Sequence, residues 1–373
     1  MSWGNPEGAA EKLLASVLRP ASAAYGVGAY ARLFAYSSGW RARHRLDAPV
    51  ISIGNITCGG TGKTPVTIDL ASRLLGAGRK VGILSRGYKR RSRDEVVIVS
   101  DGKQILAPVR DCGDEPYMVA RAVPDAVVIV GPRRHITGAI ATGVYDCDVV
   151  ILDDGFQHVQ VTRDADLVLV DYNDDPENDA LLPAGRLREP LSAVSRADQV
   201  IITRVPADPD QQRLSRLQEI IAGRAPNALQ SACSFVPYGL RPLDCPAVEV
   251  QAQALSGVKV IALAGIARPE TFVESLQSLG AKVVGTRIFS DHHWYTPQNL
   301  KALKRDLIVS GAELVVTTLK DSVRIDSEAV SGLPLSVLEI KTHWLGPLPL
   351  PAWLLKTEAG AGCRQWHCQP AGA

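Results

Sequence analysis

The sequence lacks a strong excess of charge, because its 41 lysines and arginines nearly balance its 39 aspartates and glutamates and leave a formal net charge of +2. This balance argues against a protein that coats nucleic acid. The seven cysteines are odd in number and show neither a C-x-x-C pair nor the cysteine–histidine spacing of a zinc site. We therefore expect a chain that folds in a reducing cytosol without structural zinc.

Long hydrophobic runs are also lacking. The most apolar segment, residues 13–40, is interrupted by Arg19, Pro20 and Arg32, and the charged residues that precede it do not fit a cleavable signal peptide. Basic residues follow it at positions 41–45. Residues 1–45 are therefore expected either to lie in a membrane interface, with their bases toward anionic headgroups, or to pack as a helix on the globular body.

What the sequence does contain is an alternation of β-type and helical segments. β-type runs cover residues 50–53, 80–85, 126–131, 149–153, 166–171 and 199–203. This alternation predicts an α/β fold with a mostly parallel sheet and helices on both faces over residues 46–230. Several runs end in polar residues, among them Asp153-Asp154, Asp171 and Thr203-Arg204, at the edge where such sheets bind ligands.

A second, smaller α/β domain is expected over residues 231–345. Its strands are predicted at residues 258–264, 281–288, 313–317 and 334–340, and its helices at residues 269–279 and 297–309. Residues 207–246 are rich in Pro, Asp, Gln and Ser with little periodicity, so a domain junction is expected there. Residues 346–373 read as a loosely held tail that can pack back on the first domain.

A glycine-rich segment follows the first β-type run. Residues 51–65 read Ile-Ser-Ile-Gly-Asn-Ile-Thr-Cys-Gly-Gly-Thr-Gly-Lys-Thr-Pro, and helical apolar spacing continues to residue 75. A strand, glycine-rich loop and helix in this order cradle the phosphates of a nucleotide, so the sheet over residues 46–230 is expected to have the P-loop NTPase type of architecture. The predicted ATP-binding residues are Cys58, Gly59, Gly60, Thr61, Gly62, Lys63, Thr64 and Pro65. Thr57 stands where the usual spacing has glycine, so a glycine-rich turn with a surface lysine is the alternative.

Two adjacent carboxylates follow the apolar run at residues 149–152. In a protein with a phosphate loop, Asp153 and Asp154 are in the expected place for Mg²⁺, together with the hydroxyl of Thr64. The alternative is an Asp-Asp-Gly turn that holds no metal. The residues thus indicate a nucleoside triphosphate and Mg²⁺ as ligands, and the family resemblance described next implies that the nucleotide is ATP.

Several motifs, in order along the chain, resemble the tetraacyldisaccharide 4′-kinases, the lipid A 4′-kinases of Gram-negative bacteria. The resemblance extends to about Asp321 and rests most on Asp-Asp-Gly-Phe-Gln-His at residues 153–158. The other matching segments are residues 54–65, Ser-Arg-Gly-Tyr (85–88), Gly-Asp-Glu-Pro (113–116), Leu-Pro-Ala-Gly-Arg-Leu-Arg-Glu-Pro-Leu (182–191), residues 264–272 and Ser-Asp-His-His (290–293). One departure is Leu319, where the family usually has glutamate in Thr-Glu-Lys-Asp, which puts a local contact of the second domain in doubt.

The resemblance implies transfer of the γ-phosphate of ATP to the 4′-hydroxyl of a tetraacyldisaccharide 1-phosphate. It further implies that Asp114 accepts the hydroxyl proton with help from His292, and that Lys63 acts on the phosphates. From the residues alone, Asp114-Glu115-Pro116 is equally compatible with the start of a helix. If both Asp114 and His292 act on one hydroxyl, the site is assembled between the two domains.

The expected substrate-side residues are Gln157, His158, Arg188, Glu189 and Asp291. We expect Arg188 and Glu189 to form an ion pair, and Asp291 either to orient His292 or to cap a helix. The alternative for His158 is an imidazole satisfied by a backbone carbonyl. Basic clusters at residues 86–93 and 133–135 suit an anionic phosphate or an exposed loop equally well.

The resemblance also implies a peripheral or monotopic protein at the cytoplasmic face of the inner membrane, with the N-terminal segment near the acyl chains. No nucleic acid and no obligatory protein partner are expected. Two rival functions remain from the residues alone, namely a GTP-driven switch or metallochaperone and an ATP-dependent carboxylation or ligation enzyme. Thr318-Leu319-Lys320-Asp321 approaches a guanine-binding motif only in composition, since its lysine is one place late.

Overall fold

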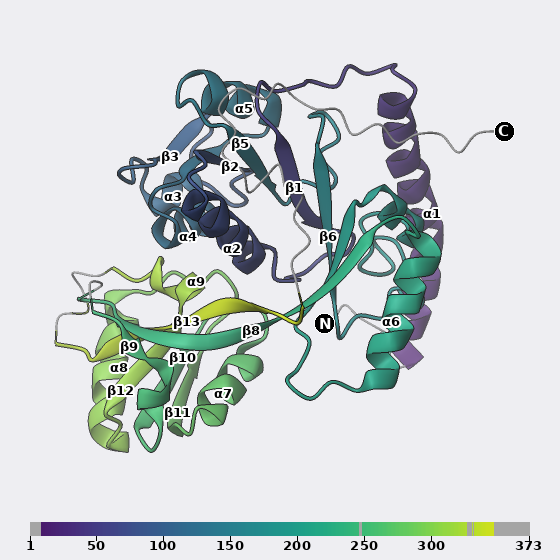
Figure 1. The fold of residues 1–373 in the computed structure, drawn as a ribbon. Coiled ribbons are helices and arrows are strands. Elements are labelled where there is room, and N and C mark those ends of the chain that lie inside the picture. Colours follow the sequence, from purple (N-terminus) through teal and green to yellow (C-terminus); the bar gives the residue numbers. More distant parts are fainter. Residues whose placement is uncertain (1–8, 246–247, 327–329, 331, 347–373) are drawn as a thin grey trace.

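One extended β-sheet organises the molecule. The computed structural model describes residues 9–245, 248–326, 330 and 332–346. In these residues thirteen strands join in the order β11-β10-β12-β13-β8-β7-β6-β1-β5-β2-β4-β3, with β9 paired to β8 (Figure 1). Figure 1 shows two lobes, which we call the N-terminal lobe (residues 46–228) and the C-terminal lobe (residues 243–338).

The N-terminal lobe contains the parallel part of the sheet. Strands β1 (Val50–Asn55), β2 (Val81–Ser85), β4 (Val127–Val130), β5 (Val149–Asp153), β6 (Ala165–Asp171) and β7 (Gln199–Thr203) pair in parallel, and β3 (Val97–Asp101) adds an antiparallel edge. β1 lies between β5 and β6 and is buried along its whole length. Burial on both faces explains why valine and isoleucine occupy three of its first four positions. The strands expected from the sequence are thus confirmed, and β3 is additional.

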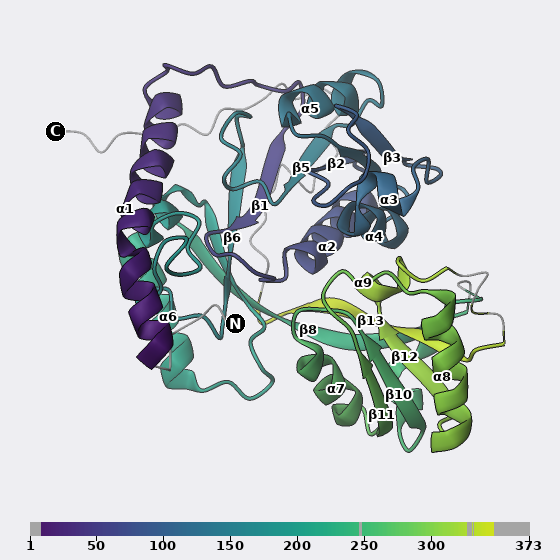
Figure 2. The same cartoon turned by 180° about the vertical axis from the view of Figure 1, so that it is seen from behind.

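Helices cover both faces of this part of the sheet (Figure 2). On one face, α2 (Lys63–Gly76) and α4 (Asp114–Ala122) bury apolar residues against β1, β2 and β5, and the short α3 (Val109–Cys112) precedes α4. The other face is covered by α5 (Arg134–Gly143), by the 3₁₀-helix η1 (Leu191–Arg196) and by α6 (Gln211–Arg224). The sheet is therefore the central layer of a three-layer arrangement.

The C-terminal lobe repeats this arrangement on a smaller scale. Strands β10 (Lys259–Ala264), β11 (Lys282–Ile288) and β12 (Leu314–Thr318) are parallel, and β12 continues in parallel to β13 (Leu335–Trp344). α7 (Pro269–Ser278) packs on one face and α8 (Pro297–Ser310) on the other. The short elements are β9 (Val250–Gln251), η2 (Ala252–Leu255) and α9 (Leu319–Ser322).

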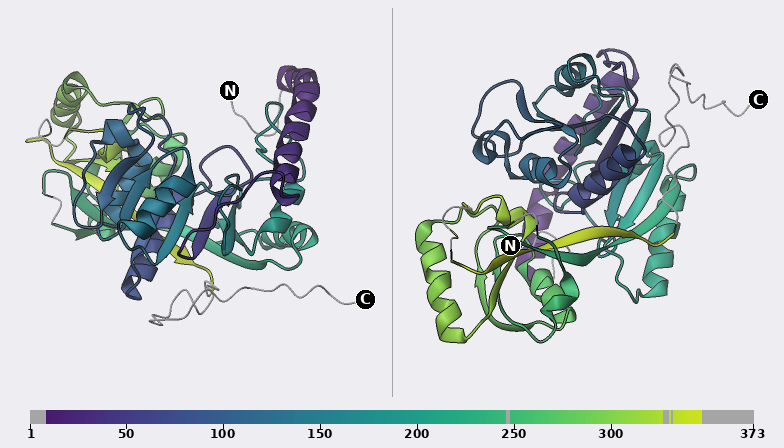
Figure 3. Two further views of the ribbon diagram at one scale, coloured as in Figure 1. Left: turned by 90° about the horizontal axis from the view of Figure 1, so that it is seen from above. Right: turned by 60° about the vertical axis from the view of Figure 1, so that its left-hand side comes forward.

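Residues 207–246, where the sequence predicts a domain junction, contain regular elements. This segment contains α6, whose first turn is capped by the carboxylate of Asp210, and the whole of the long strand β8 (Leu229–Pro242). β8 pairs in parallel with β7 through residues 229–232 and then in antiparallel fashion with β13 through residues 233–242. Most of β8 is only half-buried, which explains its weak apolar pattern. The two strands form a ribbon that runs between the lobes (Figure 3).

The ribbon also completes the N-terminal lobe. The indole Nε1 of Trp344, at the end of β13, donates to Oδ2 of Asp69 in α2 at 2.9 Å, and Oγ1 of Thr342 donates to the carbonyl of Pro65 at 3.3 Å. Phe235 of β8 and Trp344 pack against the core beneath α2. The last described strand thus lies against the helix that follows the phosphate loop.

The N-terminal segment forms the long helix α1 (Ala9–Ser37), which lies along one side of the N-terminal lobe (Figures 1 and 3). Ser22 is buried and bonds to the carbonyl of Leu181, and the hydroxyl of Tyr25 donates to the carbonyl of Arg188. Val27 and Tyr30 of the helix are mostly exposed, as is Trp40 just beyond it. Among the described helices, none is both long and apolar enough to cross a bilayer. One side of α1 therefore packs on the lobe while apolar side chains remain on the surface. Of the tail predicted at residues 346–373, residues 347–373 lie outside the described part of the chain.

Candidate active site

The phosphate loop, residues 58–64, connects β1 to α2 at the carboxyl edge of the sheet. Gly62 has a φ of 85°, and a Cβ added there would lie 2.3 Å from the ring of Phe235, so only glycine fits. α2 begins at Lys63, and Thr64 is its second residue. The Nζ of Lys63 donates to Oδ1 of Asn55 at 3.1 Å and lies 3.4 Å from Oδ1 of Asp154. The lysine is thus held at the helix N-terminus, where backbone N–H groups attract anions.

The two carboxylates that follow β5 have different environments. Asp153 is buried and accepts a hydrogen bond from Thr67 Oγ1 at 3.3 Å. Burial, followed by the negative charges of Glu115 and Asp154, raises the pKa of Asp153 to about 7. Burial also acts on Asp154, but the charges of Lys63 and Arg188 outweigh it and lower the pKa of this carboxyl. Asp154 therefore stays ionised, whereas Asp153 needs a nearby cation to be fully ionised at neutral pH.

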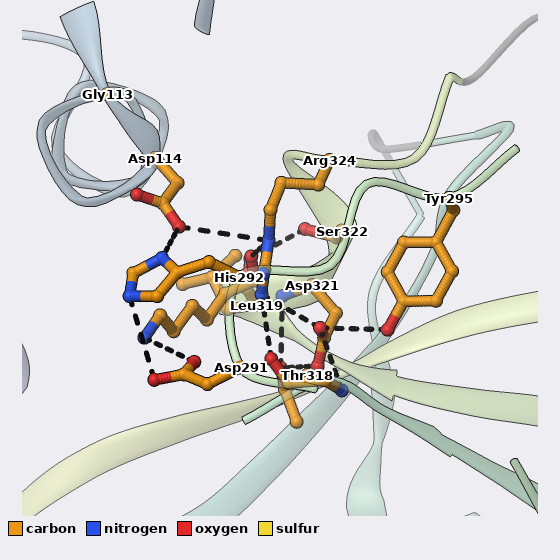
Figure 4. A network of polar contacts seen from close by, with 12 residues as sticks. Gly113, Asp114, Asp291, His292, Tyr295, Thr318, Leu319, Asp321, Ser322 and Arg324 are labelled. Atoms are coloured by element: carbon orange, nitrogen blue, oxygen red, sulfur yellow. Dashed lines mark hydrogen bonds and ion pairs between the residues drawn. The ribbon is translucent and has the colours of Figure 1, made fainter. Parts of the chain in front are cut away.

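Asp114 and His292 meet across the two lobes. Asp114 is the first residue of α4, and Nδ1 of His292 lies 2.6 Å from its Oδ2 (Figure 4). Asp114 thus begins a helix, as the residues alone allow, and it also contacts the histidine, while its role as proton acceptor stays a prediction. Burial raises the pKa of Asp114, but the hydrogen bond and charge of His292 and the charges of Arg324 and Lys320 lower it further, so the net pKa is below the usual value.

Behind this pair lies a buried polar network that the sequence did not reveal (Figure 4). The side chain of Arg324 is fully buried, and its Nε lies 3.8 Å from Oδ2 of Asp114. Its Nη2 donates to Oδ1 of Asp321 at 2.8 Å, and the hydroxyl of Tyr295 donates to the same oxygen at 2.9 Å. Asp321 therefore fixes a guanidinium that in turn faces the carboxylate of Asp114.

Asp291 belongs to the edge of the same network. Its Oδ2 lies 3.6 Å from Nε2 of His292, and its Oδ1 accepts from Nζ of Lys320 at 3.1 Å. The next helix, α8, is capped by Thr296, so Asp291 does not act as a helix cap. Leu319 packs against the core of the C-terminal lobe, and its neighbours Thr318 and Asp321 still bond to each other. The departure from the family pattern at Leu319 thus leaves the network intact.

The predicted ion pair between Arg188 and Glu189 is wrong. Nη1 of Arg188 donates to Oδ2 of Asp154 at 2.9 Å, while Glu189 is buried and accepts from Nη2 of Arg196 at 2.6 Å. The chain is extended around Leu187, which bridges to Thr57, and consecutive side chains of an extended segment point to opposite sides. Arg188 therefore joins the phosphate-loop side of the site, and Glu189 does not.

Gln157 and His158 lie near the same carboxylates. The side chain of Gln157 donates to the carbonyl of Asn55 at 2.9 Å, and its Oε1 lies 3.5 Å from Nη1 of Arg188. His158 has a buried Nε2 without a hydrogen-bond partner in the described residues, so the expected carbonyl partner is not found for this nitrogen. Burial, followed by the positive charge of Arg134, lowers the pKa of His158 to about 3. A neutral imidazole with an unused polar atom is suited to contact a ligand.

The two predicted basic clusters separate into surface and buried groups. Arg133 forms an ion pair with Glu95 on the surface, and Arg90 donates to the carbonyl of Asp94. Arg134, in contrast, is buried and donates to the carbonyl of Gly131 at 3.2 Å. Burial lowers the pKa of Arg134 to about 10, although Asp153 and Asp154 raise it. Among the described residues of these clusters, Arg134 therefore lies near the two carboxylates of the site.

A parallel α/β sheet, a phosphate loop with a fixed lysine and a nearby carboxylate–histidine pair define a phosphate-loop kinase. A family model described as tetraacyldisaccharide-1-P 4′-kinase (LpxK) matches residues 14–358. The tetraacyldisaccharide 4′-kinase of Geobacter sulfurreducens is 38% identical over 357 residues, which cover 95% of this chain and 97% of the relative. The protein of the same name from Anaeromyxobacter sp. (strain Fw109-5) is 41% identical over 326 residues, 87% of this chain and 86% of the relative.

The fold comparison agrees with the sequence comparison. A crystal structure of LpxK from Aquifex aeolicus in complex with ATP superposes with a TM-score of 0.73 at 31% identity, and the match covers 89% of this chain and 95% of that chain. The chain belongs to the tetraacyldisaccharide-1-P 4′-kinase family. The switch and the carboxylation or ligation alternatives are thereby set aside.

Proposed function

We propose that the chain transfers the γ-phosphate of ATP to the 4′-hydroxyl of a tetraacyldisaccharide 1-phosphate, a step of lipid A biosynthesis. The observation that carries the proposal is the 2.6 Å contact between Asp114 and His292, in a family member whose phosphate loop retains Lys63. A carboxylate held ionised at the junction of two lobes can accept a proton from an acceptor alcohol. The phosphate loop supplies the donor side of the same reaction.

In the proposed reaction the 4′-hydroxyl gives its proton to Asp114 while its oxygen bonds to the γ-phosphorus. The bond from that phosphorus to the bridging oxygen breaks, and ADP leaves with the electron pair. Lys63 and the N–H groups at the start of α2 stabilise the negative charge on the phosphates. His292 orients the Asp114 carboxylate and keeps it ionised, and Arg324 supports it from behind. Both lobes are needed for this arrangement.

The residues also fit a bound Mg²⁺. Thr64, Asp153 and Asp154 offer the hard oxygen ligands that this ion prefers. The pKa of Asp153 is raised, as expected for a buried carboxyl whose neighbouring cation is absent. Within the described residues no three His, Cys, Asp or Glu side chains converge as a preformed metal site, which suits an ion that arrives with nucleotide phosphates. Mg²⁺ would neutralise phosphate charge during transfer.

For the acceptor side we propose Gln157, His158, Arg188 and Asp291 as substrate contacts, with Arg134 facing an anionic group. Glu189 supports the site through Arg196 and not as a contact. The exposed apolar residues Val27, Tyr30 and Trp40, with the bases that follow, would place α1 against the inner membrane at its cytoplasmic face. The acyl chains of the substrate then reach the site from the membrane surface.

A transfer assay tests the proposed function directly. With ATP labelled at its γ-phosphate, Mg²⁺ and a tetraacyldisaccharide 1-phosphate in detergent, we expect the label in the lipid fraction. A disaccharide that already carries a 4′-phosphate is the matched control and should stay unlabelled. Release of labelled inorganic phosphate without labelled lipid would contradict the proposal.

His292→Asn should move the pH dependence of the reaction. Removing His292 removes two of the causes that lower the pKa of Asp114, while burial, which raises it, remains. The pKa of Asp114 then rises, so at a given acidic pH a smaller fraction is ionised. We expect the acidic limb of kcat/KM to shift to higher pH, with the loss of activity smallest at the alkaline end.

His293→Asn is the control for this shift, because His293 contacts Asn299 and Phe289 and not Asp114. Its pH profile should match that of the unmodified protein. An acidic limb that stays in place, or moves to lower pH, in His292→Asn would show that the histidine does not set the ionisation of Asp114.

A further inference from the structure

Arg204 lies beside the phosphate loop on the side away from Asp154. It follows β7 directly and has a φ of 58°, an uncommon value for a residue with a side chain. The preceding Thr203 donates from Oγ1 to the carbonyl of Thr61 in the loop at 2.7 Å. A Cβ added at Gly60 would lie 3.7 Å from Nη2 of Arg204. The guanidinium is therefore held against the glycine-rich turn on which nucleotide phosphates rest.

A buried carboxylate anchors this arginine together with a second one. Asp171, the last residue of β6, accepts a hydrogen bond from Nη1 of Arg204. Its Oδ2 also lies 3.6 Å from Nη1 of Arg268. Arg268 comes from the C-terminal lobe, where it precedes α7. Asp171 is 2% exposed, but the side chains of Arg204 and Arg268 are 32% and 45% exposed, so both guanidiniums are open to a ligand.

The charges of this cluster do not balance. Two guanidiniums share one carboxylate, and within the described residues neither arginine has an ion pair with any other acidic group. On the other side of the loop Lys63 and Arg188 likewise share one carboxylate, that of Asp154. A net positive charge therefore remains where a polyphosphate would lie, and guanidiniums bind phosphate oxygens through paired N–H groups.

We propose that Arg204 and Arg268 form a second phosphate-binding pair for the nucleotide, held ready by Asp171. The inference rests on the proposed function, because it assigns to ATP the anion that the pair binds. Arg204 contributes from the lobe that carries the loop, and Arg268 from the lobe that carries His292. Phosphate binding at this pair thus engages both lobes at once, as the contact of His292 with Asp114 does.

The test compares affinities for ATP and AMP by titration calorimetry in Arg204→Gln, Arg268→Gln and the unmodified protein. Loss of a charge-assisted hydrogen bond should weaken ATP binding by about 10- to 100-fold in each variant. AMP, which lacks the β- and γ-phosphates, should be weakened much less. The controls are Arg216→Gln and Arg287→Gln, which remove surface arginines paired with Glu177 and Asp306. Both controls should bind ATP normally.

Equal weakening of ATP and AMP, or unchanged ATP affinity in both variants, would overturn the proposal. If Arg204→Gln fails to fold, two other variants still test the pair. Arg204→Lys keeps the positive charge and the contact with Asp171. Arg268→Gln changes a half-exposed side chain, so this substitution should not prevent folding. The lipid-labelling assay on the unmodified protein runs in parallel. If the unmodified protein labels lipid but the variants bind ATP normally, this inference fails and the proposed function stands. If the unmodified protein does not label lipid, the proposed function fails. In that case the ATP affinities of the variants still decide whether the pair binds phosphate.

Discussion

Asp114→Asn should lower kcat for lipid phosphorylation by on the order of 10²–10⁴-fold while leaving ATP binding intact. The amide keeps the shape of the side chain but cannot accept the hydroxyl proton. Because Asp114 lies at the first position of α4 and not on the phosphate loop, the donor side of the site is unchanged. The loss should therefore appear in kcat and not in the dissociation constant for ATP, as single-turnover and calorimetric measurements will show.

The fold should tolerate this substitution. Arg324 loses one neighbouring negative charge in Asp114→Asn but keeps its 2.8 Å bond to Asp321, so no buried charge is left alone. Asp125→Asn, which changes an exposed carboxylate of the same lobe, is the matched control and should retain normal kcat. A value of kcat near normal in Asp114→Asn would mean that another group accepts the proton.

Lys63→Met should reduce kcat/KM for ATP by about 10²–10³-fold, because it removes a donor aimed at charge that develops on the transferred phosphate. Methionine has a similar length, so packing at the start of α2 is kept. Asp154 loses its 3.4 Å contact to Nζ but retains Arg188 at 2.9 Å, and the local structure should persist. The expected signature is a loss of both ATP affinity and kcat, measured by calorimetry and by steady-state kinetics.

Lys80→Met is the control for this variant, since Lys80 is an exposed lysine of the same lobe whose ion pair is with Asp146. Its kinetics should not change. Lys63→Arg is informative as well, because the planar guanidinium does not fit the space of an ammonium held between Asn55 and Asp154. Full activity in Lys63→Met would show that the loop binds phosphate through its backbone alone.

The sequence predicted the parts of the fold that have strong local patterns. Strands buried on both faces, such as β1 and β5, are rich in valine and isoleucine, and the phosphate loop and the Asp153-Asp154 pair are contiguous motifs. β8 and α6 were not predicted, because β8 is half-buried and α6 has a polar surface, so neither has a strong apolar pattern. Contacts with the rest of the fold determine these elements more than their local sequence does.

The site was predictable only where residues carry a motif. Asp114 and His292 came from the family resemblance, and nothing in their spacing of 178 positions showed that they would meet. Arg324 escaped notice because a buried arginine has no local signal that distinguishes it from a surface one. The wrong pairing of Arg188 with Glu189 has the same origin, since adjacency in sequence says little about contact in an extended segment.

The contact of Trp344 with Asp69 joins residues 275 positions apart and has a consequence for the newly made chain. α2 leaves the ribosome long before β13, which packs against it. Until β13 arrives, one flank of α2 and the core beneath it stay uncovered, because Phe235 and Trp344 complete that core. A nascent chain that stops before residue 335 therefore has a phosphate loop without its final support. We therefore expect the capacity to bind nucleotide to be acquired late in synthesis, after an interval in which this uncovered apolar surface favours aggregation.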